Sequence, residues 1–593
     1  MLSSVSSLIS RAILPIAGLV VASSWFVFAA RGATPVQQPD RAAPLLTAPE
    51  RYVTDISIAE EVLAVVQKSI TSAFLDGVRD FDWQRAARGL SPDFLGRFPT
   101  PDDGRAIDDA SLVIRRYEAT DLGMQRRDQF LETLRLHTAS WTSVERASWQ
   151  VFAFLLEPSR DRAFAKVHLQ LGGPGSAGQR TVVDATLEVQ VVEVATGEWV
   201  ISQLDFIEGS RVHNPSPPFR DITDAVGFHF NRSDVNGDLR QDIIDTRSSL
   251  IDSGLSVVDW DHDGFWDLLV TESMNHSLLF RNDGKGGFER ELLPIADSRL
   301  VPSQLLFVDL DGDGLEELVG NRVLYRDGYG SIGIYTRPDG EWVFLPQALE
   351  FDNPSDVRRT DAQAMTAADV NGDGLLDLFV AGYETDQSRD PARFNRVDAH
   401  DGADNLLFIN QGDLRFMEAS DALGITGTQY TYVAQFFDFD GDGDVDLFEG
   451  NDYGRNVVWD NTGDGFRAVA DHPLTRHASN TMGITIGDWD NTGAWGVYVS
   501  NMYSHAGRRV LRLTESLGEA MRADLEGLAA GNQLFVGDAD GGDGWEDRAR
   551  PLDVNVAGWA WGSLFYDLDN DGDKEIFVTN GNTSFRDPDA PDY

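Results

Sequence analysis

The sequence predicts a mostly β protein: a seven-bladed β-propeller, or alternatively a six-bladed one, preceded by a small α+β domain. An acidic segment recurs through the second half of the 593-residue chain, from Asp259 to Asp567, with a mean spacing of about 60 residues. The region before these repeats lacks the segment and shows helix-like and then strand-like patterns. A single hydrophobic core does not grow to this size, so we expect at least two domains.

The repeated unit is predicted to contain about four short strands. The stretch DVNGDGLLDLF at residues 369–379 is one of five intact copies of the acidic segment, and weaker copies begin at Asp234 and Asp488. Several copies are followed by a strand, a tight Gly/Asn/Asp turn and a returning aromatic strand, as in NLLFINQGDLRF at residues 405–416. Four-stranded units repeated around an axis form a β-propeller, whose strand edges are short and protected.

The acidic segment has the spacing of a cation-binding loop, D-x-D-x-D-G-x-x-[DE]. It offers side-chain oxygens at positions 1, 3, 5 and 9 and a carbonyl oxygen at position 7, while glycine at position 6 permits the sharp turn. Calcium accepts about 6–8 oxygen ligands, magnesium keeps its waters, and zinc prefers nitrogen and sulfur. We therefore predict Ca²⁺ as the cofactor, with about five ions, one for each intact loop.

The predicted ligands follow from this spacing. The side-chain ligands are Asp259, Asp261, Asp263, Asp267, Asp309, Asp311, Asp313, Glu317, Asp369, Asn371, Asp373, Asp377, Asp438, Asp440, Asp442, Asp446, Asp567, Asp569, Asp571 and Glu575. The position-7 carbonyls belong to Phe265, Leu315, Leu375, Asp444 and Asp573. A weak candidate set is Asp234, Asn236, Asp238 and Asp242, because Leu239 stands where glycine is needed. The loop at Asp488 has Thr492 and Gly496 in place of two acids, so we interpret it as a structural remnant.

Two other interpretations of the acidic loop fit the sequence less well. A helix–loop–helix calcium motif needs glutamate at position 12, and four of the five loops have Val or Gly there, with Glu449 as the exception. The flanking residues also have strand-like rather than helical patterns. Acidic β-turns that bind nothing would not need five intact copies with an acid at the ninth position.

Composition excludes several functions. The net charge is −47, which makes nucleic acid and anionic membrane surfaces poor partners for the chain as a whole. The absence of cysteine rules out disulfides, thiol nucleophiles and thiolate metal sites. There is no G-x-S-x-G, H-E-x-x-H or P-loop motif, so no catalytic residue is predicted.

Residues 1–31 are predicted to be a signal peptide or an N-terminal membrane anchor. Arg11 precedes an uncharged apolar run over residues 12–30, and Val27-Phe28-Ala29 offers a small-residue cleavage site. Residues 32–50 have the composition of a linker. We therefore expect an exported protein that is periplasmic, cell-surface or secreted, and any contact with the membrane is expected only through residues 12–30.

Residues 51–212 are predicted to form the α+β domain. One helix is expected to start near Asp55, with Ile58, Val62, Val65, Val66 and Ala73 on one face, and a second helix is expected over residues 124–137. The strand-like runs cover residues 147–157, 164–171, 181–194 and 198–208. Helices followed by a strand meander weakly resemble the cone-shaped SnoaL-like/nuclear-transport-factor-like fold, whose concave sheet often holds a small ligand.

Residues 219–593 resemble FG-GAP/VCBS repeats, the calcium-loop blades of the integrin α-subunit propeller. The closer resemblance is to the bacterial cartilage-acidic-protein-like (ASPIC/UnbV-associated) group, through FRDITDAVGFHF (219–230), NQLF (532–535) and GWAWGSLFYDLDNDGDKEIFVTNGN (558–582). This resemblance implies a seven-bladed extracellular or periplasmic propeller with structural calcium, used for adhesion or binding, and no assigned reaction. Asp234 and Asp259 are too close for a full blade, and the last unit lacks its outer strands before Tyr593, so six and seven blades both stay open.

The sequence thus favours a non-enzymatic, exported, calcium-binding propeller whose partner is a protein or a glycan. One alternative is a propeller-based glycan hydrolase or lyase in which calcium is structural. Another is a small-ligand sensor that uses the N-terminal domain. Trp559 and Trp561 are interpreted as packing between blades rather than as a sugar-stacking platform.

Overall fold

The computed structural model describes most of the chain beyond the predicted export segment. The described residues are 56–108, 112–119, 122–216, 219, 221–228, 253–272, 278–293, 295, 300–322, 332–338, 340–350, 362–383, 397–504, 507, 511, 518–537 and 544–581. The predicted segments 1–31 and 32–50 and the weak loop at Asp234 lie outside them. Within these residues, no helix is both long and apolar enough to cross a membrane. The chain divides into two compact units, one within residues 37–220 and one within residues 221–503 and 519–582.

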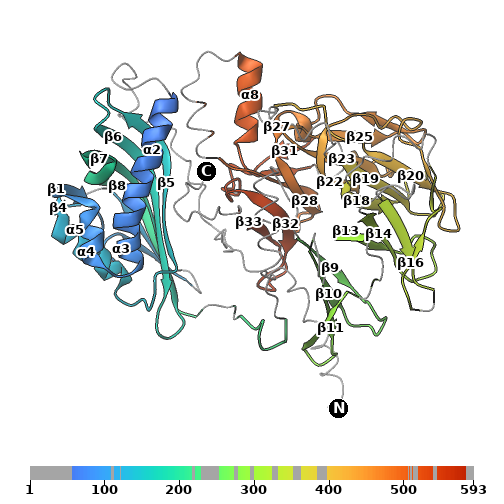
Figure 1. The fold of residues 1–593 in the computed structure, drawn as a ribbon, viewed down its shortest axis with the longest axis horizontal. Coiled ribbons are helices and arrows are strands. Elements are labelled where there is room, and N and C mark those ends of the chain that lie inside the picture. The colour runs from blue at the N-terminus through green and yellow to red at the C-terminus, as the bar shows by residue number, and fades with distance from the viewer. Residues whose placement is uncertain are drawn as a thin grey trace. The chain divides into compact units, whose positions relative to one another are not determined.

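The N-terminal unit is an eight-stranded sheet with helices packed against it (Figure 1). The central strands follow the order β2-β3-β8-β7-β6-β5, and β1 pairs with both β8 and β4. The helices are α2 (Ile56–Ile70), the π-helical turn η3 (Thr71–Leu75), α3 (Asp76–Arg79), α4 (Trp83–Arg88) and α5 (Arg127–Thr138). The strands are β1 (Leu90–Arg97), β2 (Arg105–Asp108), β3 (Val113–Glu118), β4 (Gln125–Arg126), β5 (Arg146–Leu156), β6 (Arg162–Pro174), β7 (Arg180–Ala195) and β8 (Glu198–Asn214).

This arrangement confirms the predicted helices and strands, with one correction to the first helix. Strands β6 and β7 alternate buried and half-buried residues, as expected for a sheet with one face in a core. Helix α2 buries Leu63, Val66 and Ile70, whereas Val65 is 39 % exposed. The predicted helix face was therefore wrong at Val65, because each residue turns the helix by about 100° and Val65 points away from the buried side.

Among the described residues, the second unit contains five sheets, each built from four antiparallel strands, and the third sheet has a fifth, parallel strand at its edge. Two further sheets have two strands each. In chain order the five sheets contain β9–β12, β13–β16, β18–β21, β22, β23, β25 and β26, and β28–β31. Their strands are β9 (Ser253–Val258), β10 (Asp267–Glu272), β11 (Leu278–Asn282), β12 (Phe288–Leu292), β13 (Leu300–Val308), β14 (Glu317–Arg322), β15 (Ile332–Thr336), β16 (Val343–Leu345), β18 (Ala362–Ala368), β19 (Asp377–Gly382), β20 (Leu406–Asn410), β21 (Phe416–Glu418), β22 (Tyr430–Phe437), β23 (Asp446–Asp452), β25 (Val457–Asn461), β26 (Phe466–Ala468), β28 (Thr481–Gly487), β29 (Gly496–Asn501), β30 (Gln533–Val536) and β31 (Glu546–Asp547). The remaining elements are β17 (Leu349–Glu350), β24 (Gly454–Arg455), η7 (Pro473–Thr475), β27 (Ala478–Ser479), α8 (Glu519–Leu528), β32 (Ala560–Tyr566) and β33 (Glu575–Asn580).

The sheets are arranged as the blades of a propeller. The first strand of each sheet contacts the first strand of the next, in the order β9, β13, β18, β22, β28 and β32. In Figure 1 the colours accordingly pass from green through orange to red from one sheet to the next. The predicted four-stranded unit with an acidic loop between its first two strands is confirmed in the five sheets that the structure describes.

In two units, the segment that precedes the first strand forms a backbone hydrogen bond with the outermost strand of the same unit. Phe288 and Phe466 begin such strands, and their backbone N–H groups donate to the carbonyls of Val226 and Leu423 at 2.7 and 2.6 Å. Both carbonyls lie in one-turn segments with the related sequences DITDAVGF and EASDALGI, at residues 221–228 and 418–425. Because these bonds cover a strand edge, they protect each sheet from pairing with another chain.

Candidate metal centres

Each intact loop turns sharply at positions 4 and 6. Glycine at position 6 has φ between 87° and 100° in all five loops, from Gly264 to Gly572. Side chains rarely adopt this conformation, which explains why position 6 is always glycine. At position 4 the φ values lie between 57° and 79°, and this left-handed region also accepts His262 and Asn570.

The aspartate at position 1 builds this turn through backbone hydrogen bonds. The N–H of the position-6 glycine donates to its Oδ2 in every intact loop, at 2.8 Å for Gly374–Asp369 and at 3.0–3.1 Å in the others. Charged acceptors make strong hydrogen bonds to backbone N–H groups, so the aspartate at position 1 holds the turn in place without a bound ion.

The acid at position 9 joins the loop to the sheet. One oxygen of Asp377 accepts the N–H of Val370 at 3.0 Å and the other accepts the N–H of Asn410 at 2.8 Å. Asp267 and Asp446 make the equivalent pairs of bonds, and all three side chains are at most 2 % exposed. Position 9 therefore ties the loop, the second strand and the third strand together.

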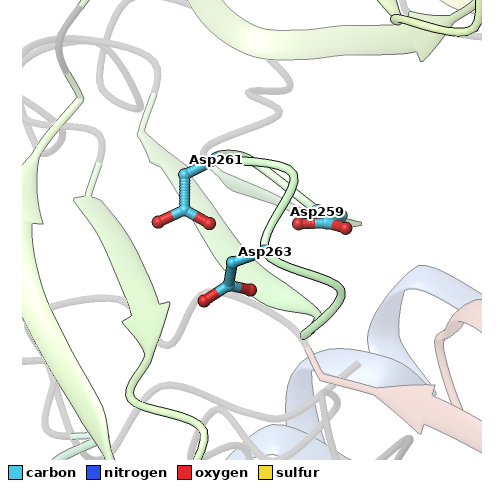
Figure 2. A group of neighbouring side chains, drawn as sticks. All are labelled: Asp259, Asp261 and Asp263. Atoms are coloured by element: carbon cyan, nitrogen blue, oxygen red, sulfur yellow. The ribbon is translucent and has the colours of Figure 1, made fainter.

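In four loops the structure brings three carboxylates together, with one oxygen of each within 4.8 Å of the others. These groups are Asp259, Asp261 and Asp263; Asp309, Asp311 and Glu317; Asp438, Asp440 and Asp446; and Asp567, Asp569 and Asp571. Figure 2 shows the first group gathered around its turn. The loop at residues 369–377 forms no such group of three acids, since Asn371 replaces one of them.

The donor sets fit a hard divalent cation. All side-chain donors are oxygens, which suits Ca²⁺ rather than zinc. The Oδ1 atom of Asp259 is buried and has no hydrogen-bond partner among the described residues, so a cation would satisfy it. The predicted ligands Asp267, Asp313, Asp442 and Glu575 belong to the same loops but not to these tight groups.

The position-9 acids carry an electrostatic cost in the absence of a cation. Burial raises the pKa of Glu317 to about 7 and those of Asp377 and Asp446 to about 6, and neighbouring carboxylates of the same loop add to the rise. The backbone N–H bonds act in the opposite direction and lower each pKa. A bound divalent ion would favour the ionised forms, because an opposite charge nearby lowers a carboxyl pKa.

Sequence patterns alone did not identify two charged residues that lie near the loops. Arg281 of β11 forms an ion pair with Asp261, with Nη1 2.9 Å from Oδ2. Asp460 of β25 lies beside Asp440, and its charge is one of the causes, after burial and the Asp442 carboxylate, that raise the pKa of Asp440. Aligning LLFRN (278–282) with VVWDN (457–461) on their final asparagines would have revealed both.

The loop at residues 488–496 keeps the turn without the full donor set. Thr492 and Gly493 donate backbone N–H groups to Asp488 at 3.1 Å each, as in the intact loops. Position 9 is Gly496 and supplies no carboxylate. The Nζ of Lys574 donates to the backbone carbonyl of Asp488 at 3.0 Å.

The two tryptophans of GWAWG lie in the last sheet and beside it. Trp561 of β32 donates its indole N–H to the carbonyl of Gly581 at 2.6 Å, and its ring lies 6.1 Å from that of Tyr432 in β22. Trp559 forms an isolated bridge with Met502. Both side chains are half-buried, in agreement with the packing interpretation.

A family model described as FG-GAP-like repeat matches this chain three times, at residues 259–320, 309–380 and 438–499. No curated protein matches.

Similar solved structures include a conserved protein from Planctomyces limnophilus, with 15 % identity, 26 % of this chain and 97 % of that chain covered, and a TM-score of 0.19. A hexachlorocyclohexane dehydrochlorinase from Novosphingobium barchaimii has 13 % identity, coverages of 26 % and 90 %, and a TM-score of 0.18. A ketosteroid isomerase-like protein from Erwinia carotovora atroseptica has 16 % identity, coverages of 25 % and 96 %, and a TM-score of 0.18. At these TM-scores the likenesses identify neither the fold nor the activity of this chain. The three matched segments are thus similar to FG-GAP-like repeats, and the sheets that contain them are arranged as the blades of a β-propeller.

Proposed function

We propose that this protein is an exported, calcium-binding β-propeller that acts as a binding or adhesion module for a protein or glycan partner. Calcium would hold the hairpin between the first two strands of each intact blade closed. The observation that carries the proposal is the convergence of three carboxylates in each of four loops of the repeat unit. The buried Oδ1 of Asp259, which has no hydrogen-bond partner among the described residues, and the buried position-9 acids Asp267, Glu317, Asp377 and Asp446 support it.

The loops also suit a binding module because of their common position. Each one connects the first strand of a blade to the second, so neighbouring blades present their loops on the same face of the propeller. Stiffening these loops with cations would fix the shape of that face before a partner arrives. Such preorganisation favours affinity because less conformational freedom is lost on binding.

Chelation tests the calcium part of the proposal. A ligand that binds only the native state stabilises it by mass action, so EDTA should lower the melting temperature of the calcium-loaded protein by several degrees or more. Adding back excess Ca²⁺ should restore it, whereas the same excess of Mg²⁺ should restore less. An unchanged melting temperature, in protein verified to carry metal before chelation, would contradict calcium binding.

One assay distinguishes a glycan-binding module from the alternative of a glycan-cleaving enzyme. Calcium-loaded protein is incubated with a panel of glycans, and both retention and cleavage products are measured. Retention without products supports the binding module. Products that disappear on heat inactivation indicate the glycan hydrolase or lyase instead.

We also propose that the propeller has seven blades, with six as the alternative, and that the chain is related to the cartilage-acidic-protein-like group. Five sheets of four or five strands and the two-stranded sheet β32–β33, all within the described residues, support a ring larger than five blades. A crystal structure grown with calcium tests the number, since a closed ring of six blades would exclude seven.

A second candidate function belongs to the N-terminal unit, which we propose to be SnoaL-like and to bind a small ligand. A hollow of about 370 Å³ is lined in part by Phe98, Met124 and Thr133. The buried Oε1 of Gln125 in its wall has no hydrogen-bond partner among the described residues. Screening small molecules for stabilisation of the full chain tests this candidate, and Gln125→Leu should abolish the stabilisation by any hit.

A further inference from the structure

The residue that faces position 9 across the sheet differs from blade to blade. In the blade that has Gly496 at position 9, the direct partner on the third strand is Val536. The same register in the other blades places Arg281, Thr336, Ile409 and Asp460 at this site, which we name the facing position. Among the five blades whose third strand the structure describes, one thus has a cation there, one has an anion, and three have uncharged side chains.

Arg281 is held against the first acidic loop. Its Nη1 lies 2.9 Å from Oδ2 of Asp261, which occupies position 3, and its Nε lies 3.0 Å from Oε1 of Glu291 in β12. Two carboxylates therefore orient the guanidinium, so its positive charge stays beside a loop that is otherwise built to attract one. Arginine remains charged at all relevant pH values.

The facing residue of the loop at residues 438–446, Asp460, carries the opposite charge. Its side chain is 17 % exposed and pairs with Arg467, whose side chain is 74 % exposed, at 2.6 Å. Asp460 lies near enough to Asp440 and Asp446 for its charge to act on both. This loop also carries Asp444 at position 7, which adds a further negative charge.

We propose that the facing position sets the calcium affinity of each loop, with Arg281 weakening the loop at 259–267 and Asp460 strengthening the loop at 438–446. The inference rests on the proposed calcium binding and adds a ranking to it. Since like charges repel and opposite charges attract, the 438–446 loop would stay loaded at calcium concentrations that empty the 259–267 loop. The blade that contains Arg281 would then respond to changes in calcium while the blade that contains Asp460 would not.

Terbium luminescence on the full chain tests the ranking at the first loop. Terbium occupies calcium sites and is excited through nearby tryptophan, and Trp266 stands at position 8 of this loop with 51 % exposure. The signal lost in a Trp266→Phe background identifies the first loop. Displacement of this signal by Ca²⁺ then gives its relative affinity.

Arg281→Ile, which installs the residue of the third blade, should lower the calcium midpoint about fivefold or more, and Arg281→Asp should lower it further. Arg281→Lys keeps the charge and should stay near the wild type. Arg550→Ile removes the same charge from an exposed residue outside the acidic loops and should leave the midpoint unchanged. Midpoints of Arg281→Ile and Arg281→Asp within twofold of the wild type would overturn the inference.

The reciprocal variant completes the test. Asp460→Ile should weaken the tightest class of calcium sites, measured by calorimetric titration of the chelated full chain, about fivefold or more. No change in that class would overturn the role of Asp460. A chain that binds neither terbium nor calcium would instead overturn the proposed function itself, together with the ranking built on it.

Discussion

The loops at residues 369–377 and 488–496 have the same turn but different interiors. In both, the aspartate at position 1 accepts backbone N–H groups from positions 5 and 6: Asp369 at 3.1 and 2.8 Å, and Asp488 at 3.1 Å from each. The loop at residues 369–377 has the buried Asp377 at position 9, and the loop at residues 488–496 has Gly496 there. The turn is therefore built by position 1 and glycine, and it persists where the cation-binding set is incomplete.

In the loop at residues 488–496, which we call the degenerate loop, Trp489 and Lys574 lie beside the position-9 glycine and the turn. A Cβ atom added at Gly496 would lie 2.5 Å from Cδ1 of Trp489 and 3.2 Å from the carbonyl oxygen of Gly487. The backbone N–H of Lys574 donates to the carbonyl of Trp489 at 3.0 Å, and its side chain bonds the carbonyl of Asp488. The comparison shows that a blade tolerates the loss of the position-9 carboxylate when neighbouring groups occupy its place.

The largest expected effect comes from deleting the position-9 acid in the intact loop. Asp377→Ala leaves the buried N–H groups of Val370 and Asn410 without acceptors, so it should lower the free energy of unfolding by about 4 kcal/mol. Denaturant unfolding in EDTA measures this cost without a contribution from cations. As a control, Asp490→Ala at position 3 of the degenerate loop removes an exposed carboxylate and should cost about 0.5 kcal/mol or less. Equal losses in the two variants would contradict the anchoring role of position 9.

Both of these loops have valine at position 12 on the second strand, Val380 and Val499, whereas the loop at residues 438–446 has Glu449 there. Glu449 is 1 % exposed, and neither carboxyl oxygen has a hydrogen-bond partner of normal geometry among the described residues. Burial raises its pKa to about 7, although the side chains of Asn405 and Trp459 favour the charged form. The folded state therefore keeps this proton to a higher pH than the unfolded state does.

The raised pKa of Glu449 makes the folded state less stable as the pH rises. Below the ordinary pKa of 4.5 both states are protonated and Glu449 has no effect. As the pH rises from there to about 7, the unfolded state loses the proton first, so the wild type should lose up to about 3 kcal/mol relative to Glu449→Gln. Unfolding at pH 4.5 and 8 in saturating calcium measures this difference, with Glu289→Gln at an exposed position as the control. Parallel pH profiles of the wild type and Glu449→Gln would contradict the prediction.

The smallest expected effect comes from trying to restore the degenerate loop. Gly496→Asp places a side chain against Trp489, so it should lower the free energy of unfolding by about 1–3 kcal/mol and should add no bound calcium ion. Denaturant unfolding and calcium titration of the full chain check the two parts. A stable variant that binds one more ion than the wild type would show that the missing carboxylate alone separates the two loops.

Much of this architecture was predictable from local sequence. The repeat spacing, the Gly/Asn/Asp turns and the aromatic return strands predicted four-stranded units, because these patterns fix local φ values and strand periodicity. The acids that converge in four loops were also predicted by their spacing in one short segment. The face of helix α2 was misplaced at Val65, since a mixed apolar pattern does not by itself decide which residues meet a sheet.

The sequence by itself determined where each acidic loop lies and which oxygens it offers, because those residues are close together along the chain and glycine dictates their turn. Tertiary structure decided which acids are buried, that Arg281 and Asp460 face two different loops, that Trp489 occupies the space beside Gly496, and that Glu449 lies in a core. These outcomes depend on strands and blades that are distant in sequence, and their neighbours are set by the packing of the whole propeller rather than by local preference.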